Sequence, residues 1–184
     1  MTSRIALRWL TLCLTASLPV AVGGCGFQPI YMPTASGKPG VAQRELAAVF
    51  VPVIAERPGQ LLRQALQKRF GDDSGAAAAY DLRVTFSVSG EGIAIEQDTI
   101  ATRVRLIGTA NWTLISRDPG QPPLTSGSAR ALDAINIFDE QYFAADLETE
   151  AVQGRIAENI AQQITLQLAA WFRKQAPQTA AKSG

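Results

Sequence analysis

The ten residues Tyr80-Asp-Leu-Arg-Val-Thr-Phe-Ser-Val-Ser89 alternate between apolar and polar side chains without a break. Because successive side chains of a β-strand point to opposite faces of the sheet, this pattern predicts a half-buried strand. The inner face is expected to carry Tyr80, Leu82, Val84, Phe86 and Val88. The outer, solvated face is expected to carry Asp81, Arg83, Thr85, Ser87 and Ser89. The stretch therefore predicts a sheet that is covered on one face only.

Two further strands are predicted after this stretch. Gly90-Glu-Gly92 breaks the alternation as a β-bulge would, and residues 96–99 are expected to form a hairpin turn. Residues 102–115 return as a long strand, and residues 124–137 form a weaker one after the Pro- and Gly-rich turn 116–123. The inner face of these strands is expected to carry Val104, Leu106, Gly108, Ala110, Trp112, Leu114, Ala129, Ala131 and Ile135. The three strands form an antiparallel meander.

A first strand and two helices complete the predicted elements. Residues 45–54 are a short apolar run, and Pro52, which cannot donate to a ladder, favours an edge position or a bulge. A helix is expected from Pro58 to a stop at Gly71, with an apolar face at Leu62, Leu66 and Phe70. A second helix is expected within residues 139–174. Its apolar stripe is Leu147, Ile156, Ile160, Ile164, Leu168, Trp171 and Phe172.

The element order is β-α-β-β-β-α, which predicts an α/β fold in the form of a two-layer sandwich. Two helices are expected to pack on one face of a four-stranded, mostly antiparallel sheet. The first strand connects through a helix and can pair in parallel, which would make the sheet mixed. The expected domain is residues 41–174, and residues 175–184, which carry no core residue, are expected to be a disordered tail.

The first 24 residues have the pattern of an export signal. Two arginines precede the apolar run 10–22, and two glycines separate that run from Cys25. Val22-Gly-Gly-Cys25 resembles a bacterial lipobox, in which the cysteine thiol receives a diacylglyceryl group and becomes the acylated N-terminus. Several acyl chains suffice for stable anchoring. The alternatives are an ordinary signal with a chance cysteine and an uncleaved membrane helix.

Residues 25–40 are rich in Gly and Pro and are expected to form a lipidated tether. In many Gram-negative bacteria an aspartate directly after the lipidated cysteine retains a lipoprotein in the inner membrane. Gly26 occupies that position here, so we expect sorting to the outer membrane.

The composition excludes several kinds of chemistry. The chain has 17 basic and 16 acidic residues, and removal of Arg4 and Arg8 with the signal leaves a net charge near −1. This balance does not indicate a nucleic-acid binder. The chain has no histidine, and Cys13 and Cys25 are its only cysteines. Ser-His-Asp and Cys-His catalysis and His- or Cys-based metal sites are therefore not expected. No cofactor is expected besides the lipid on Cys25.

Cys25-Gly-Phe-Gln-Pro-Ile-Tyr31 is similar to the Cys-Gly-aromatic start of the LptE family of outer-membrane lipoproteins. The element order, the Trp112-Thr-Leu strand followed by a Pro/Gly turn, and the long last helix also match. The resemblance covers about residues 25–173 and is greatest to α-proteobacterial members. It implies a lipid-anchored plug on the periplasmic face of the outer membrane. Such a plug sits inside the LptD β-barrel and assists delivery of lipopolysaccharide to the cell surface.

The resemblance places lipopolysaccharide contacts on basic residues in the hairpin after the second strand and just before the last helix. Residues 89–102 and 136–147 contain no Lys or Arg, so these contacts do not carry over. The nearest alternatives are Arg103, Arg105 and Arg130. Arg103 and Arg105 share one strand face and could grip phosphates together. The alternative is that they are solvated residues of the outer sheet face.

Other candidate sites have simpler explanations. Phe86 and Trp112 lie on the apolar face of their strands, which favours core packing over a ligand pocket. Asp72-Asp73 suits a solvated turn, and Glu148 and Glu150, two apart on a helix, do not face each other. A non-enzymatic plug is therefore favoured. A carboxylate-based cell-envelope hydrolase and a lipoprotein that binds peptidoglycan or another assembly partner remain as alternatives.

Overall fold

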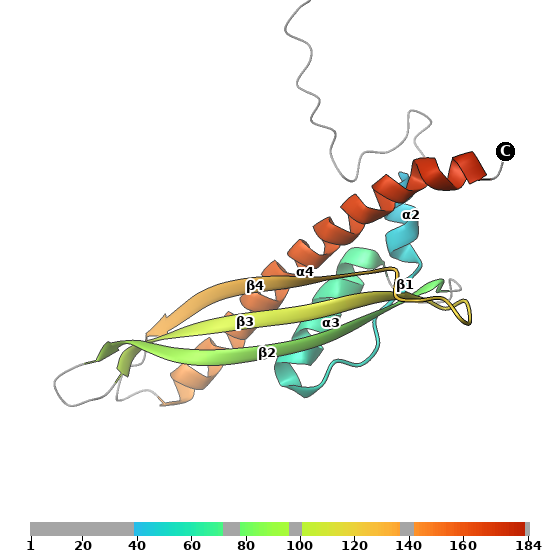
Figure 1. Cartoon of the computed structure of the whole chain (residues 1–184). Coiled ribbons are helices and arrows are strands. Elements are labelled where there is room, and N and C mark those ends of the chain that lie inside the picture. Colours follow the sequence, from blue (N-terminus) through green and yellow to red (C-terminus); the bar gives the residue numbers. More distant parts are fainter. Residues whose placement is uncertain (1–38, 72–77, 96–100, 137–141, 183–184) are drawn as a thin grey trace, which may run out of the picture.

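The computed structural model describes residues 39–71, 78–95, 101–136 and 142–182. The elements are α2 (Val41–Ala47), β1 (Val49–Phe50), α3 (Glu56–Phe70), β2 (Tyr80–Ile95), β3 (Ala101–Ser116), β4 (Thr125–Asn136) and α4 (Tyr142–Lys182). The strands form one sheet in the order β1-β2-β3-β4, and α3 and α4 lie behind it (Figure 1). The predicted two-layer α/β sandwich with a four-stranded mixed sheet is confirmed.

The predicted meander is the centre of the sheet. β2 and β3 pair antiparallel with Leu82 opposite Leu114 and Phe86 opposite Ala110, and all four side chains are buried. β3 and β4 pair antiparallel with Ala110 opposite Ala129. The alternation of β2 therefore sets which face of all three strands is buried. The ladder becomes irregular after Gly92, next to the predicted bulge, and the predicted turn 96–99 lies outside the described residues.

β1 pairs in parallel with the start of β2, and Pro52 explains why β1 is short. Val49 lies opposite Tyr80, whose N–H donates to the carbonyl of Ala48 at 3.2 Å. In a parallel ladder this alternation would next require residue 52 to donate to the carbonyl of Leu82. A proline has no N–H to give, so the ladder ends. Pro52 was expected to mark an edge position or a bulge; β1 is an edge strand, and Pro52 lies just after its end.

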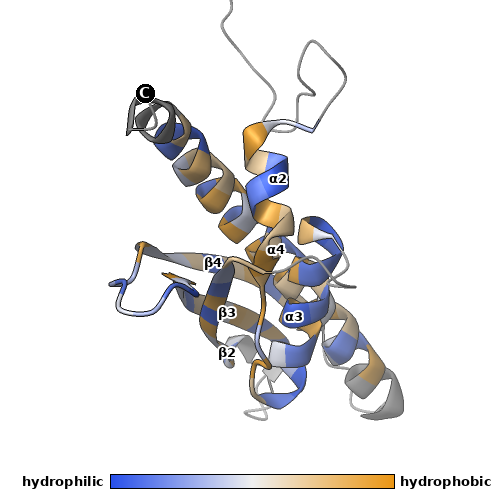
Figure 2. Cartoon of the chain, turned by 90° about the vertical axis from the view of Figure 1, so that its right-hand side faces the viewer, coloured by the Kyte–Doolittle hydropathy of each residue, from blue (hydrophilic) through white to orange (hydrophobic). Residues whose placement is uncertain are grey.

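The segment predicted as a strand over residues 45–54 is only partly a strand. Residues Val41–Ala47 form helix α2, and only Val49–Phe50 pair in the sheet. Ala42 and Leu46, one helical turn apart, are buried, and α2 packs mainly on α4. Figure 2 shows hydrophobic and hydrophilic residues interleaved along this short helix. The apolar side chains before Val49 are spaced for a helix packed on a neighbour, and this contact overrides the β-rich appearance of the segment.

The helix layer follows the predicted stripes. Leu62, Leu66 and Phe70 of α3 are buried, and Gly71, with φ at +103°, follows the last helical residue. The buried residues of α4 include Val152, Ile156, Ile160, Ile164, Leu168 and Phe172. Leu147 is 73% exposed and does not belong to the stripe.

Helix α4 is also longer than predicted. It continues to Lys182, whereas residues 175–184 were expected to form a disordered tail after a helix end at Lys174. Alanine and glutamine, which are good helix formers, are common in this stretch, and the helix continues through Pro177.

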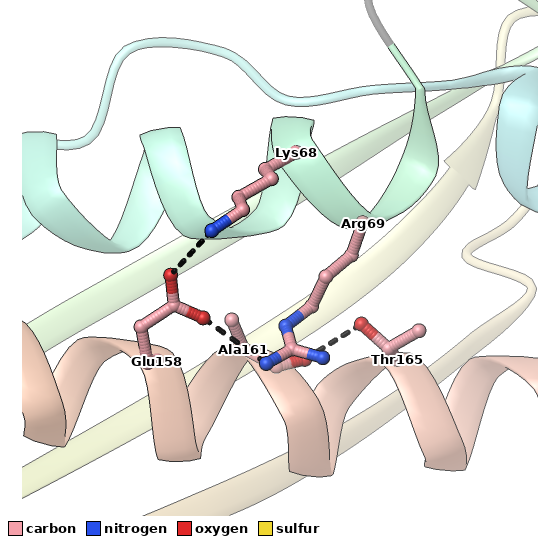
Figure 3. A network of polar contacts seen from close by, with 5 residues as sticks. All are labelled: Lys68, Arg69, Glu158, Ala161 and Thr165. Atoms are coloured by element: carbon pink, nitrogen blue, oxygen red, sulfur yellow. Dashed lines mark hydrogen bonds and ion pairs between the residues drawn. The ribbon is translucent and has the colours of Figure 1, made fainter.

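A polar network joins α3 to α4 (Figure 3). Glu158 of α4 accepts a hydrogen bond from Arg69 at 3.0 Å and lies 3.8 Å from the ammonium of Lys68. Thr165, the buried polar residue of the core, donates its hydroxyl to the carbonyl of Ala161 at 2.6 Å. The threonine thereby satisfies its hydroxyl within its own helix, and the carboxylate ties the two helices together at their exposed side.

Candidate functional site

The face of the sheet opposite the helices is the candidate functional surface. No described helix covers it (Figure 1). Its side chains on β2 and β3 are predominantly polar and, as predicted, are exposed or half-buried. They are Asp81, Arg83, Thr85, Ser87, Arg103, Arg105, Thr109, Asn111 and Thr113. We refer to this surface, together with the outward residues of β4, as the outer face.

The three predicted arginines lie on the outer face but do not form one cluster. Arg103 and Arg105 are exposed and two residues apart on β3, a spacing of about 6.6 Å. Arg130 is exposed on β4 and lies opposite Thr109, four residues further along β3 from Arg105. Arg105 is 3.8 Å from the carboxylate of Glu91, and both side chains are about half exposed. Such a contact is weak, so the guanidinium remains available to an anionic partner.

An apolar pair interrupts the polar side chains of the outer face. Ile107 of β3 and Leu132 of β4 are directly paired, and Leu132 is 53% exposed. Arg105 precedes Ile107 by two residues, and Arg130 precedes Leu132 by two, so each arginine neighbours one apolar residue on the same face. This pair was not predicted from the sequence. The available signal was that Leu132 has the opposite parity to the inward residues of β4.

A shallow groove continues from Leu132 toward α4. It has a volume of about 370 Å³, and Arg130, Leu132, Gln163 and Leu166 are among its lining residues. The side-chain amide of Gln163 forms hydrogen bonds with both the N–H and the C=O of Arg130. Its Nε2 donates to the carbonyl at 2.9 Å, and its Oε1 accepts from the N–H at 3.4 Å. The backbone of Arg130 is thus fixed while its guanidinium is exposed.

A larger cavity lies where α2, α4 and the β3–β4 turn meet. Its volume is about 590 Å³, and its walls include Tyr80, Trp171 and Phe172. The Tyr80 hydroxyl donates to Glu45 at 3.0 Å. Burial, with a further contribution from Glu45, raises the pKa of Tyr80 to about 12. The ionisable groups in this cavity are Glu45, Asp118 and Tyr80, so it is not suited to phosphate.

The described carboxylates are mostly engaged by arginines. Glu150 pairs with Arg57, and Asp133 accepts a hydrogen bond from Arg155 at 2.6 Å. This hydrogen bond lowers the pKa of Asp133 below its ordinary value. Asp81 pairs with Arg117 at 2.8 Å, and the Arg117 guanidinium also lies over the ring of Phe50. These carboxylates therefore have structural partners. Asp72-Asp73 and Cys25 lie outside the described residues.

Among the described residues there is neither a cluster of metal-binding side chains nor a membrane-spanning helix. Within residues 39–71, 78–95, 101–136 and 142–182, no group of three or more metal-binding side chains is close enough to hold an ion. In the same part of the chain, no helix combines the length and the apolarity needed to cross a membrane.

Phe86 and Trp112 belong to the core, as predicted. Trp112 is 4% exposed, and its indole N–H donates to Oε1 of Gln167 on α4 at 3.1 Å. Neither residue lines a described cavity. The fold and the outer face thus define a two-layer α/β sandwich whose open sheet surface combines exposed arginines with an apolar pair.

A comparison with protein families identifies this class of protein more closely. The family described as "LptE: Lipopolysaccharide-assembly" matches residues 46–168, which is more than half of the chain. The chain therefore belongs to the LptE lipopolysaccharide-assembly family. A comparison with curated protein sequences finds no match.

A comparison with solved structures finds lipoproteins among the matches. A candidate lipoprotein from Caulobacter crescentus is 25% identical, with a TM-score of 0.60, over 72% of this chain and 96% of that one. A minor lipoprotein from Acinetobacter baumannii is 18% identical, with a TM-score of 0.47, over 66% and 88% of the two chains. Lipoprotein B from Nitrosomonas europaea is 12% identical, with a TM-score of 0.48, over 67% and 81%.

Proposed function

We propose that this protein is a non-enzymatic lipoprotein of the outer membrane that plugs the LptD β-barrel and assists lipopolysaccharide assembly. Family membership supports a role in lipopolysaccharide assembly. The main observation in favour of a plug is the outer face, a wide polar surface that no described helix covers. The lumen of a large outer-membrane barrel is lined by polar side chains, so a plug needs a hydrogen-bonding surface of this kind.

The expected lipid anchor is compatible with this position. Cys25 is 14 residues before residue 39, where the described structure begins, and an extended chain of that length spans at most about 50 Å. A sandwich anchored in this way would stay close to the periplasmic face of the membrane. We propose Cys25 as the lipidated residue and the outer membrane as its location.

The outer face also suits an anionic amphiphile such as lipopolysaccharide. Arg103 and Arg105 offer two neighbouring guanidinium groups, which bind phosphate well. Ile107 and Leu132 lie beside Arg105 and Arg130 and offer apolar area for an acyl chain. We propose direct contact with lipopolysaccharide at this surface, with Arg105 and Arg130 as its charged neighbours.

The test is a charge reversal on the outer face. Arg103→Glu combined with Arg105→Glu should leave the protein folded, because both side chains are exposed. The double variant should recover less LptD with the tagged protein and should raise sensitivity to a large hydrophobic antibiotic. The matched control is Arg44→Glu with Lys174→Glu, the same change of charge at exposed positions on the helices.

Two results would contradict the proposal. One is a wild-type protein that never co-purifies with LptD and whose depletion leaves outer-membrane permeability unchanged. The other is a control variant that loses LptD as strongly as the outer-face variant does, since the effect would then come from net charge alone.

A further inference from the structure

The two edges of the sheet differ in how completely other parts of the structure cover them. The free edge of β4 faces α4, where Gln167 Nε2 donates to the carbonyl of Ser128 at 3.0 Å and Gln163 bonds the backbone of Arg130. The free edge of β2 has only the two residues of β1 beside it, although β2 is 16 residues long. Within the described residues, no hydrogen bond reaches the backbone of β2 on that edge beyond the β1 ladder.

The hydrogen bonds at the start of β2 show which of its backbone N–H and C=O groups point toward the open edge. The Tyr80 N–H bonds to Ala48 on the β1 side, and the Ala79 carbonyl accepts from Arg117 on the β3 side. Backbone groups of successive residues point to opposite sides of a strand. The N–H and C=O groups of even-numbered residues along β2 therefore face the open edge. Val84, Phe86 and Val88 present three donors and three acceptors in a row.

The inward side chains along this edge are incompletely covered. Leu82 is fully buried, but Val84 and Val88, on the same face, are only partly buried against the core. β2 contains neither proline nor lysine, two residues that natural proteins use to block pairing at an edge. The open edge thus has unpaired backbone groups and partly exposed apolar side chains, without a proline or a lysine to block pairing.

We propose that this edge pairs with the same edge of a second copy of the chain. The two β2 strands would run antiparallel about a two-fold axis at Ser87, which joins two four-stranded sheets into one of eight strands. Phe86 would lie opposite Val88 of the other copy, and Thr85 opposite Ser89. Arg83 would lie opposite Glu91, and symmetry makes this ion pair twice.

The charged side chains of β2 favour an axis at Ser87 over an axis at a neighbouring position. Arg83 is exposed and has no ion pair within the described residues, and Glu91 has only its 3.8 Å contact with Arg105. An axis at Phe86 would place Asp81 opposite Glu91, two like charges, and an axis at Val88 would separate Arg83 from Glu91. An axis between two residues would set even positions against odd ones, so the outward backbone groups would not meet. Opposite charges across neighbouring strands stabilise a pair, and like charges destabilise it.

This contact goes beyond the proposed plug and does not depend on it. It uses the edge of β2, whereas the plug uses the outer face. A dimer would be a form of the protein outside the barrel. It can therefore be tested on the full chain without LptD, and its failure would leave the proposed function unchanged.

Cysteine cross-linking tests the axis. Ser87→Cys places a thiol on the axis, opposite its own copy in a non-hydrogen-bonded pair with Cα atoms about 4.5 Å apart, which suits a disulfide. Oxidation of the full chain in detergent should then give a covalent dimer on a non-reducing gel. The unchanged chain controls for Cys13 and Cys25. Ser89→Cys controls for random collision, because its copies would be about 13 Å apart.

Charge reversal tests the register. Sedimentation of the full chain in detergent should show a monomer–dimer equilibrium, and Arg83→Glu or Glu91→Arg should each weaken the dimer about tenfold. The combined variant should restore it, whereas Arg103→Glu, on β3, should leave it unchanged. The proposal is overturned if the wild type is monomeric throughout, if Ser89→Cys cross-links as well as Ser87→Cys, or if the combined variant does not recover the dimer.

Discussion

Trp112 of β3 donates its indole N–H to the side-chain oxygen of Gln167 on α4 at 3.1 Å. The same glutamine donates to the carbonyl of Ser128 on β4 at 3.0 Å, so one amide joins the core of the sheet, its edge strand and the helix layer. Trp112 is buried and has no other described partner for its N–H.

Gln167→Ala should lower the free energy of unfolding by about 1–3 kcal/mol, because it leaves a buried donor without an acceptor. Chemical denaturation of the two proteins measures the difference. Gln162→Ala, at an exposed position on the same helix, is the control and should have little effect. Equal losses in the two variants would mean that the hydrogen bond contributes nothing beyond a general effect of the substitution.

Two glycines should respond to alanine in opposite ways. A Cβ on Gly108 would lie 2.3 Å from Cγ2 of Ile156, whereas a Cβ on Gly154 meets nothing within 4 Å. Gly108→Ala should cost about 1–3 kcal/mol through overpacking. Gly154→Ala, within α4, should stabilise the protein by up to about 1 kcal/mol through helix propensity. Thermal or chemical unfolding checks the two signs, and a neutral Gly108→Ala would show that β3 and α4 are not in close contact.

Tyr80 should titrate far above an ordinary tyrosine. Its pKa is raised to about 12 by burial and by its hydrogen bond to Glu45. The neutral form is favoured in the folded state, so its stabilising contribution is complete below pH 10 and is lost as the pH rises toward 12. The difference in ultraviolet absorbance between wild type and Tyr80→Phe isolates this residue from the other two tyrosines. A midpoint near 10 would contradict the packing of Tyr80 against α2.

The ionised carboxylate of Asp133 should stabilise the folded protein at neutral pH and lose this effect in acid. The hydrogen bond from Arg155 lowers its pKa in the folded state, so the contribution is present above the unfolded pKa of about 3.9 and is lost as the pH falls through the folded value. Asp133→Asn should cost about 1 kcal/mol or less at pH 7, since the pair is largely exposed. The cost should shrink between pH 5 and pH 3. Asp118→Asn is the control, and a cost that is constant with pH would exclude the charge as its source.

The expected anchor can be tested separately from the fold. Cys25→Ala should abolish incorporation of labelled palmitate and should release or mislocalise the protein, with little effect on the stability of residues 41–173. Cys13→Ala should keep the label, because Cys13 belongs to the expected signal. Unchanged labelling of the Cys25→Ala protein would show that Val22-Gly-Gly-Cys25 is not a lipobox.

The alternation from Tyr80 to Ser89 was enough to predict the buried face of the sheet and the layer that covers it. A period of two is a strong signal because a shift by one residue would expose every apolar side chain of the strand. The order and the length of the strands needed more information. The parity of β2 does not show that β1 ends after Phe50, because that depends on which neighbour would have used the missing N–H of Pro52.

The candidate surface was only partly predictable. The outward positions of Arg103, Arg105 and Arg130 followed from strand parity, but the separation of Arg130 from the other two depends on the register between β3 and β4. The pairing of Ile107 with Leu132 depends on the same register. Helix α2 was missed because seven residues are too few to show a clear period, and its stability comes from contact with α4.

The position of α4 in the chain has a consequence for biosynthesis. This helix supplies Ile156, Ile160, Ile164 and Leu168, which cover the buried face of the sheet, and it follows all four strands in the chain. During synthesis the apolar face of β2 and β3 therefore has no cover from α4 until residues 156–168 have emerged. Apolar strand surface exposed in this way is prone to association, so the interval before α4 docks is the stage at which the new chain most needs protection.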